Sequence, residues 1–123
     1  MKEDINKVEI DYFQLMEKDD FNLNVKNIIK EIDKKYDLLI ICNPNNPTGK
    51  FLSLKQMEEI LEKCNKLDTK LFVDEAFIEF LENGKNQSII NTEKNKKNLL
   101  IIRAFTKFFA IPGLRLGYGF CFD

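Results

Sequence analysis

The sequence predicts an α/β fold, in which a mostly parallel sheet forms part of a three-layer sandwich. Short continuous apolar runs at residues 37–42, 71–73 and 99–102 are typical of strands that are buried on both faces. A strongly amphipathic segment at residues 53–66 separates the first two runs, which is the order of a parallel βαβ unit. Because a domain usually needs about 100–200 residues, we expect one domain, residues 1–123.

The segments before the first buried run carry weaker signals. Residues 7–15 alternate loosely between apolar and polar side chains, and we interpret them as an edge strand. Residues 19–22 are predicted to form a loop. Asn24 can cap the helix that follows, because its side chain can accept a hydrogen bond from the first turn. The apolar face of that helix consists of Val25, Ile28, Ile29 and Ile32.

The helix at residues 53–66 has the clearest signals in the chain. Ser53 and Gln56 have the spacing of a capping box, in which each side chain bonds the backbone N–H of the other. One stripe of the helix is apolar, as a helix that packs on a sheet requires, and it consists of Leu54, Met57, Ile60, Leu61 and Cys64.

The last third of the chain alternates between polar and apolar segments. Residues 82–98 are rich in Asn and Lys and are predicted to be a solvated surface connection. Residues 116–122 follow the third apolar run and are predicted to form a final strand.

Composition excludes several classes of protein. The formal net charge of −1 argues against a nucleic-acid-binding surface, which needs a basic excess. No apolar run approaches the roughly 18 residues of a membrane helix, and the N-terminus lacks the apolar core of a signal peptide. The three cysteines have no close pair, which indicates a reducing, cytoplasmic setting without a metal site. The absence of histidine excludes Ser-His triad chemistry within this chain.

Polar motifs follow each of the three apolar runs. The first run leads into Asn-Pro-Asn-Asn-Pro-Thr-Gly at residues 43–49, the second into Asp74-Glu75, and the third into residues 103–107, Arg-Ala-Phe-Thr-Lys. In open α/β sheets, ligands bind beyond the carboxyl ends of the strands. The three motifs are therefore expected to converge on a shared crevice, with Arg115 on the turn that follows.

Each motif also has a purely structural interpretation. Asn, Pro and Gly favour turns, so residues 43–49 alone could be a simple turn. Asp74-Glu75 could be a solvated strand end, and Lys107 alone could be an ordinary surface lysine. A chain with 17 lysines and only two arginines, Arg103 and Arg115, favours planar anion binding where it does use arginine. The ordered combination of these motifs at successive strand ends favours a binding site.

The segments Asn43–Gly49, Val73–Phe77 and Thr106–Gly119 together resemble the signature segments of the fold-type-I pyridoxal-phosphate (PLP) enzymes, the class I/II aminotransferase family. Within that family the chain is most similar to histidinol-phosphate aminotransferases and threonine-phosphate decarboxylases. The resemblance implies a fragment of the PLP-dependent transferase large domain, corresponding to its central part. Lys107–Arg115 is the most specific element of the resemblance.

The resemblance implies a role for each residue of the site. Lys107 would hold PLP as a Schiff base and serve as the catalytic acid and base. Asp74 would pair with the pyridine nitrogen and favour its protonated form. Asn46 would donate to the 3′ oxygen of the cofactor. Arg115, eight residues after Lys107, would bind the phosphate.

Two positions depart from the family pattern. Ala104 stands where family members usually carry a Ser or Thr that binds the phosphate, and Thr106 would replace that hydroxyl only in part. Phe77 stands where many aminotransferases carry a Tyr that reaches the 3′ oxygen, so Asn46 would be the main donor there. Phe77 also favours the decarboxylase branch weakly.

The resemblance further implies a small amino-acid substrate, phosphorylated substrates included, and a homodimer for full-length members. Segments that stack on the cofactor ring and grip the substrate carboxylate are not recognisable in the chain. An inactive α/β remnant, or a module that works only in assembly with another chain, is therefore an alternative. A phosphate-binding switch domain that uses Asp74 to hold a metal is a third alternative. Such domains need an acidic cluster near the first strand, and this chain has none there.

Overall fold

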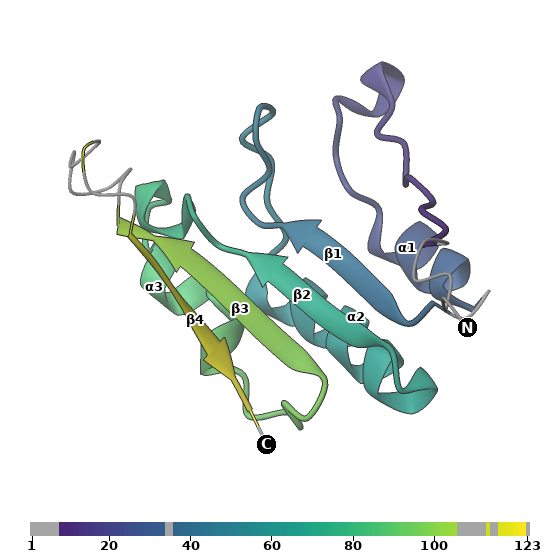
Figure 1. Ribbon diagram of the computed structural model, residues 1–123. Coiled ribbons are helices and arrows are strands. Elements are labelled where there is room, and N and C mark those ends of the chain that lie inside the picture. The colour runs from purple at the N-terminus through teal and green to yellow at the C-terminus, as the bar shows by residue number, and fades with distance from the viewer. Residues whose placement is uncertain (1–7, 34–35, 106–112, 114–115, 123) are drawn as a thin grey trace, which may run out of the picture.

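The fold is a four-stranded sheet in the order β1-β2-β3-β4 (Figure 1). The computed structural model describes residues 8–33, 36–105, 113 and 116–122. The first three strands are parallel and the last is antiparallel to its neighbour. The mostly parallel α/β sheet predicted from the sequence is confirmed. The strands are β1 (Leu38–Cys42), β2 (Lys70–Asp74), β3 (Leu99–Ala104) and β4 (Gly117–Cys121).

Helices cover one face of this sheet in the described part of the chain (Figure 1). The described residues therefore form two of the three layers of the predicted sandwich, the sheet and one helical layer. No helix among the described residues is long and apolar enough to cross a membrane. The α-helices are α1 (Val25–Ile32), α2 (Leu54–Leu67) and α3 (Gly84–Gln87). The single-turn 3-10 helices are η1 (Glu17–Asp19), η2 (Ile78–Phe80) and η3 (Ile89–Asn91).

Both longer helices begin at the predicted caps. The side chain of Asn24 accepts a hydrogen bond from the backbone N–H of Asn27 at the start of α1. Ser53 and Gln56 form the complete capping box at the start of α2. At its other end, α2 stops at Asp68, whose left-handed backbone (φ 56°) turns the chain back toward β2.

The core lies between this helical layer and the sheet. Inward-facing side chains of β1, β2 and β3 alternate with outward-facing ones, so each strand contributes every second residue. The buried core side chains include Ile28, Ile32, Ile41, Met57, Ile60, Leu61, Cys64, Leu71, Val73, Leu99 and Ile101. The apolar stripe predicted for residues 53–66 is therefore the face that α2 buries.

The opposite face of the sheet carries exposed apolar side chains. Ile40 is 61% exposed, Leu38 is 49% exposed and Leu100 is 37% exposed. They belong to the same face because each lies an odd number of positions from the buried residues of its strand. The apolar runs therefore predicted strands correctly, but only one face of those strands is covered by the described residues.

Residues 7–15 were expected to form an edge strand, and this prediction is wrong for the described part, residues 8–15. These residues adopt no regular structure, and Val8, Ile10 and Tyr12 are all more than half exposed. No strand of the described sheet pairs with them. A short alternating pattern is not enough to form a strand without a neighbour that bonds its backbone. The predicted loop at residues 19–22 is mostly correct, although η1 includes Asp19.

The segment at residues 82–98 is more structured than a solvated connection. It contains α3 and η3, and it buries Gly84, Ser88, Ile89, Thr92 and Asn98. A Cβ at Gly84 would lie 1.8 Å from the carbonyl oxygen of Ile78, so the close approach of α3 to η2 requires glycine there. The polar side chains in this segment bind other parts of the chain, which the composition alone does not reveal.

The three cysteines provide a test of this fold through their reactivity. Burial raises the pKa of Cys64 to about 11, and its side chain is inaccessible, whereas Cys121 is exposed. Because the thiolate is the reactive form, a thiol reagent at neutral pH is expected to modify Cys121 first and Cys64 only after unfolding. Mass spectrometry of the chain after timed labelling would measure this order. Labelling of Cys64 in the native chain at the rate of Cys121 would contradict the packing of α2.

Candidate functional site

The carboxyl ends of β1, β2 and β3 lie at one edge of the sheet, where the sequence predicted that they converge (Figure 1). The register pairs Cys42 with Asp74 and Asp74 with Ile102, so the three strands end close to the same level. Beyond the register, the backbone N–H of Asn43 donates to Asp74 O (2.9 Å) and that of Glu75 donates to Ile102 O (2.8 Å). The three polar motifs therefore begin side by side.

The loop after β1 is closed by a buried asparagine. The side chain of Asn43, 1% exposed, donates from Nδ2 to the carbonyl oxygen of Leu52 (2.9 Å). Its Oδ1 accepts from the backbone N–H of Leu52 (2.7 Å). Gly49, at φ 70°, takes a left-handed conformation that favours glycine and donates from its N–H to Asn45 O (2.8 Å). This loop holds Asn46, which is exposed, between two fixed ends.

Replacing Asn43 by alanine is expected to lower the free energy of unfolding by about 1–2 kcal/mol, because both backbone groups of Leu52 lose their partner. Urea denaturation followed by circular dichroism would measure the change. The matched control is Asn22→Ala, which removes an exposed asparagine side chain whose hydrogen bond to Asp19 O is local. Equal small effects of both substitutions would contradict a closing role for Asn43.

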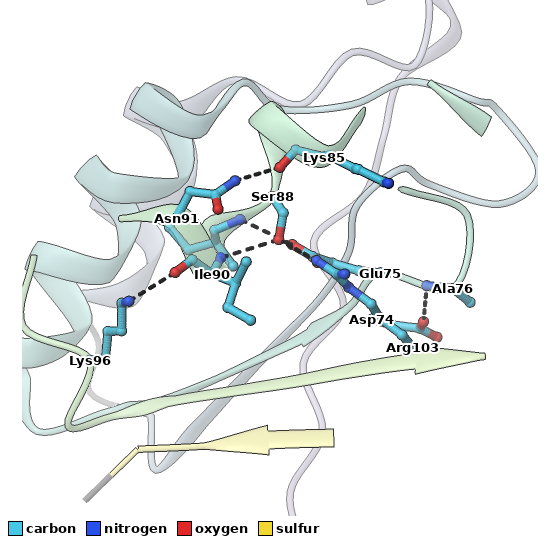
Figure 2. A network of polar contacts seen from close by, with 10 residues as sticks. Asp74, Glu75, Ala76, Lys85, Ser88, Ile90, Asn91, Lys96 and Arg103 are labelled. Atoms are coloured by element: carbon cyan, nitrogen blue, oxygen red, sulfur yellow. Dashed lines mark hydrogen bonds and ion pairs between the residues drawn. The ribbon is translucent and has the colours of Figure 1, made fainter. Parts of the chain in front are cut away.

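Asp74 ends β2 with its side chain on the open face of the sheet. Its Oδ1 accepts a hydrogen bond from the backbone N–H of Ala76 (2.9 Å), which fixes the carboxylate (Figure 2). No hydrogen bond from the described residues reaches Oδ2. Burial raises the pKa of the neighbouring Cys42 thiol, and the negative charge of Asp74 raises it further. Asp74 is thus a positioned carboxylate beside a neutral thiol.

Glu75 points to the other face and is buried, so the alternative of a solvated strand end is wrong for this residue. Its Oε1 accepts from the backbone N–H of Ile89 (3.1 Å), and the Ser88 hydroxyl lies 2.9 and 2.7 Å from its two oxygens. Its Oε2 accepts from Nε (3.0 Å) and Nη2 (2.9 Å) of Arg103. Figure 2 shows Ser88 and Arg103 beside the glutamate.

Arg103 forms an ion pair with Glu75 and contacts further residues. Its Nη2 also donates to the hydroxyl of Ser88 (2.7 Å), and its guanidinium lies 5.6 Å from the ring centroid of Phe120. Burial lowers the pKa of Arg103, but its hydrogen bonds to Glu75 and Tyr118 outweigh that effect, so the pKa is raised. Arg103 was expected to bind an anion through its planar guanidinium, and the anion that it binds is the Glu75 carboxylate.

Sequence reasoning missed the contributions of Asn43, Glu75 and Ser88. The alternation of side chains along a strand could have predicted the burial of Asn43 and Glu75, because both residues continue the inward-facing positions of β1 and β2. Ser88 lies in the segment interpreted as a solvated connection, and no local pattern marks it.

The remaining predicted site residues fall in two groups. Thr106, Lys107 and Arg115 lie outside the described residues. Ala104 is the last residue of β3 and lies on the same face as Asp74. Phe77 follows β2 and lies 5.9 Å from Phe80 between ring centroids. The structure thus brings together Asn43–Gly49, Asp74 and Ala104 at one edge.

The chemistry of this edge suits a cationic heteroaromatic ring. A carboxylate with one oxygen fixed by a backbone N–H and a second oxygen directed to the open face can accept a charge-assisted hydrogen bond from a protonated ring nitrogen. The exposed amide of Asn46 can donate to a phenolic oxygen. A carboxylate and an amide are the groups that a protonated pyridine nitrogen and a phenolic oxygen require, respectively.

Comparison with known proteins is consistent with this chemistry. A sequence model of the aminotransferase class I and II family matches residues 4–123. The threonine-phosphate decarboxylase of Salmonella typhimurium is 37% identical over 110 residues, which are 89% of this chain and 29% of the relative. The chain therefore spans about a third of the length of the curated relatives it matches.

Solved structures of aminotransferases have a similar fold. The histidinol-phosphate aminotransferase of Clostridium acetobutylicum superimposes with a TM-score of 0.74 at 39% identity, covering 83% of this chain and 30% of that one. A PLP-bound structure of a Clostridium difficile protein described as an aminotransferase superimposes with a TM-score of 0.73 at 28% identity. The match covers 89% of this chain and 29% of that one.

Proposed function

Because this chain belongs to the aminotransferase class I and II family, we propose that residues 1–123 are the central part of a large domain that binds PLP. The whole protein would be an amino acid decarboxylase or an aminotransferase. The observation that carries this proposal is the carboxylate of Asp74, held by Ala76 at the edge where three parallel strands end.

When bound, PLP supplies an electron sink for the bonds at the substrate Cα. Asp74 would keep the ring nitrogen protonated, since a nearby carboxylate favours the cationic form. Asn46 would donate to the 3′ oxygen and orient the ring. Lys107 would hold PLP through its side-chain amine, and the same amine would move a proton at Cα or C4′. Arg115 and Thr106 would bind the phosphate.

The substrate we propose is a small amino acid, with phosphorylated amino acids included, acted on in the cytoplasm by a homodimer. Both reactions are supported, because the similar proteins include a histidinol-phosphate aminotransferase and a threonine-phosphate decarboxylase. Release of carbon dioxide from a phosphorylated amino acid, measured against amino transfer to 2-oxoglutarate, separates these reactions.

Titration of the chain with PLP tests the proposal. We expect the absorbance band of lysine-bound PLP to appear and saturate, and the mass after borohydride reduction to increase by one PLP per chain. Lys107→Ala is expected to abolish both changes. A folded wild-type chain that gives neither the band nor the added mass would refute PLP binding by this chain.

An inactive remnant is the second candidate, and Ala104 is the observation that favours it. Restoring a hydroxyl with Ala104→Ser is expected to strengthen PLP binding by about 1–2 kcal/mol, or roughly 5–30-fold, because the phosphate gains a charged hydrogen bond. The PLP dissociation constant from the absorbance titration measures this change. Cys121→Ser, which places the same side chain on β4, is the control and is expected to leave the constant unchanged. Equal constants for Ala104→Ser and the wild type would contradict a phosphate position beside residue 104.

A further inference from the structure

We propose that the buried ion pair between Glu75 and Arg103 positions the Asp74 carboxylate for PLP. The inference rests on the proposed function. Glu75 and Arg103 would be positioning residues, since they lie on the helix-covered face of the sheet while Asp74 lies on the open face.

The ion pair fixes one orientation of the glutamate. Glu75 is fully buried, and both of its oxygens have partners, from Ser88, Ile89 and Arg103. The Ser88 hydroxyl also accepts from the backbone N–H of Ile90 (3.2 Å), which ties it to η3. A buried polar network in which every member has a partner specifies a single geometry.

This geometry is transmitted to Asp74 through the backbone. Asp74 and Glu75 are consecutive, so a fixed Glu75 side chain on one face sets the direction of Asp74 on the other. The backbone N–H of Glu75 donates to Ile102 O (2.8 Å), which extends the β2–β3 pairing by one residue. Loss of the ion pair would free the peptide that follows Asp74, including the Ala76 N–H that holds its carboxylate.

Arg103 acts in the same way on the neighbouring strand. It lies in β3, four residues before Lys107. Its partners are Glu75, which follows β2, Ser88 between α3 and η3, and Phe120 on β4. The ion pair therefore joins the end of β2, which presents Asp74, to β3. It sets the spacing between the Asp74 carboxylate and the end of β3.

Stability alone does not account for an ion pair at this position. Proteins in which both members of a buried ion pair are replaced by apolar or neutral residues are often as stable as the original. We therefore expect replacement of both Glu75 and Arg103 to affect the position of Asp74 more than the stability of the fold.

The double variant Glu75→Gln/Arg103→Met tests the inference. The introduced glutamine keeps an acceptor for Ile89 and a donor for Ser88, and the introduced methionine keeps a long apolar side chain. The ion pair is lost, together with the contacts of Arg103 to Ser88, Tyr118 and Phe120. The matched control is Glu62→Gln/Lys94→Met, which makes nearly the same change at an exposed ion pair of 2.7 Å. Arg103→Lys is the second test variant, because it keeps the charge and loses the two-point contact.

We expect the PLP dissociation constant of the double variant to rise about tenfold or more, with no change in the control. Nitrogen NMR of isotope-labelled PLP would show the ring nitrogen losing its proton at lower pH than in the wild type, because Asp74 no longer faces it. A merely structural role would not move that pH. Arg103→Lys is expected to shift both quantities in the same direction by a smaller amount.

The outcomes separate the two proposals. If wild-type chain does not bind PLP at Lys107, the proposed function and this inference both fail. If wild type binds and a folded double variant has wild-type affinity and ring titration, only the positioning role is overturned. If the double variant is unfolded by circular dichroism, Arg103→Lys decides in the same way.

Discussion

Replacing Arg103 by alanine is expected to lower the free energy of unfolding by about 3–5 kcal/mol, because it leaves a buried carboxylate without its cation. Glu75 is 1% exposed, and Arg103 supplies two of the hydrogen bonds to its Oε2. The loss of two charged hydrogen bonds inside the protein costs far more than the loss of an exposed ion pair. Urea denaturation at neutral pH would measure the change.

Lys94→Ala is the control for this experiment, because Lys94 pairs with Glu62 at an exposed site. It is expected to leave the urea midpoint nearly unchanged. A midpoint for Arg103→Ala as close to wild type as that of the control would show that Glu75 finds another partner or becomes neutral at little cost. The buried network would then be wrong as described.

Substitution of Asp74 by asparagine is expected to weaken PLP binding by roughly 10–100-fold. Asparagine keeps an Oδ1 that can accept from the Ala76 N–H, so the fold of the strand end is preserved. What is lost is the negative charge that favours a protonated ring nitrogen. The absorbance titration with PLP would measure the dissociation constant.

Asp68→Asn is the matched control, since it makes the same change at an exposed carboxylate that ends α2. It is expected to leave the dissociation constant unchanged. Equal affinities for wild type and Asp74→Asn would mean that the ring nitrogen lies elsewhere. In that case the convergence of strand ends would not form the proposed site.

The sequence predicted those elements whose signals are local. The capping box of Ser53 and Gln56 and the apolar stripe behind it determine α2 without help from the rest of the chain. The three apolar runs likewise predicted three parallel strands, because such runs have few other uses. The edge strand predicted at residues 7–15 is absent from the described residues 8–15, because a strand needs a neighbouring strand that its own sequence does not specify.

The candidate site was predicted in part. Asp74 lies where the strand-end rule placed it, and Asn46 lies on the loop after β1. Glu75 and Arg103 were not recognised as partners, because their contact joins two strands and depends on Ser88 from a third segment. Charged residues at strand ends resemble solvated groups in sequence, and only packing distinguishes them.

The most direct test of this account is to identify which lysine PLP modifies. The chain has 17 lysines, most of which are expected to be equally reactive if PLP binds without a site. Borohydride reduction followed by peptide mapping is predicted to place the label on Lys107 alone at one PLP per chain. A label that is spread over several lysines, or absent from Lys107 in the folded chain, would contradict the proposal that these strand ends form a PLP site.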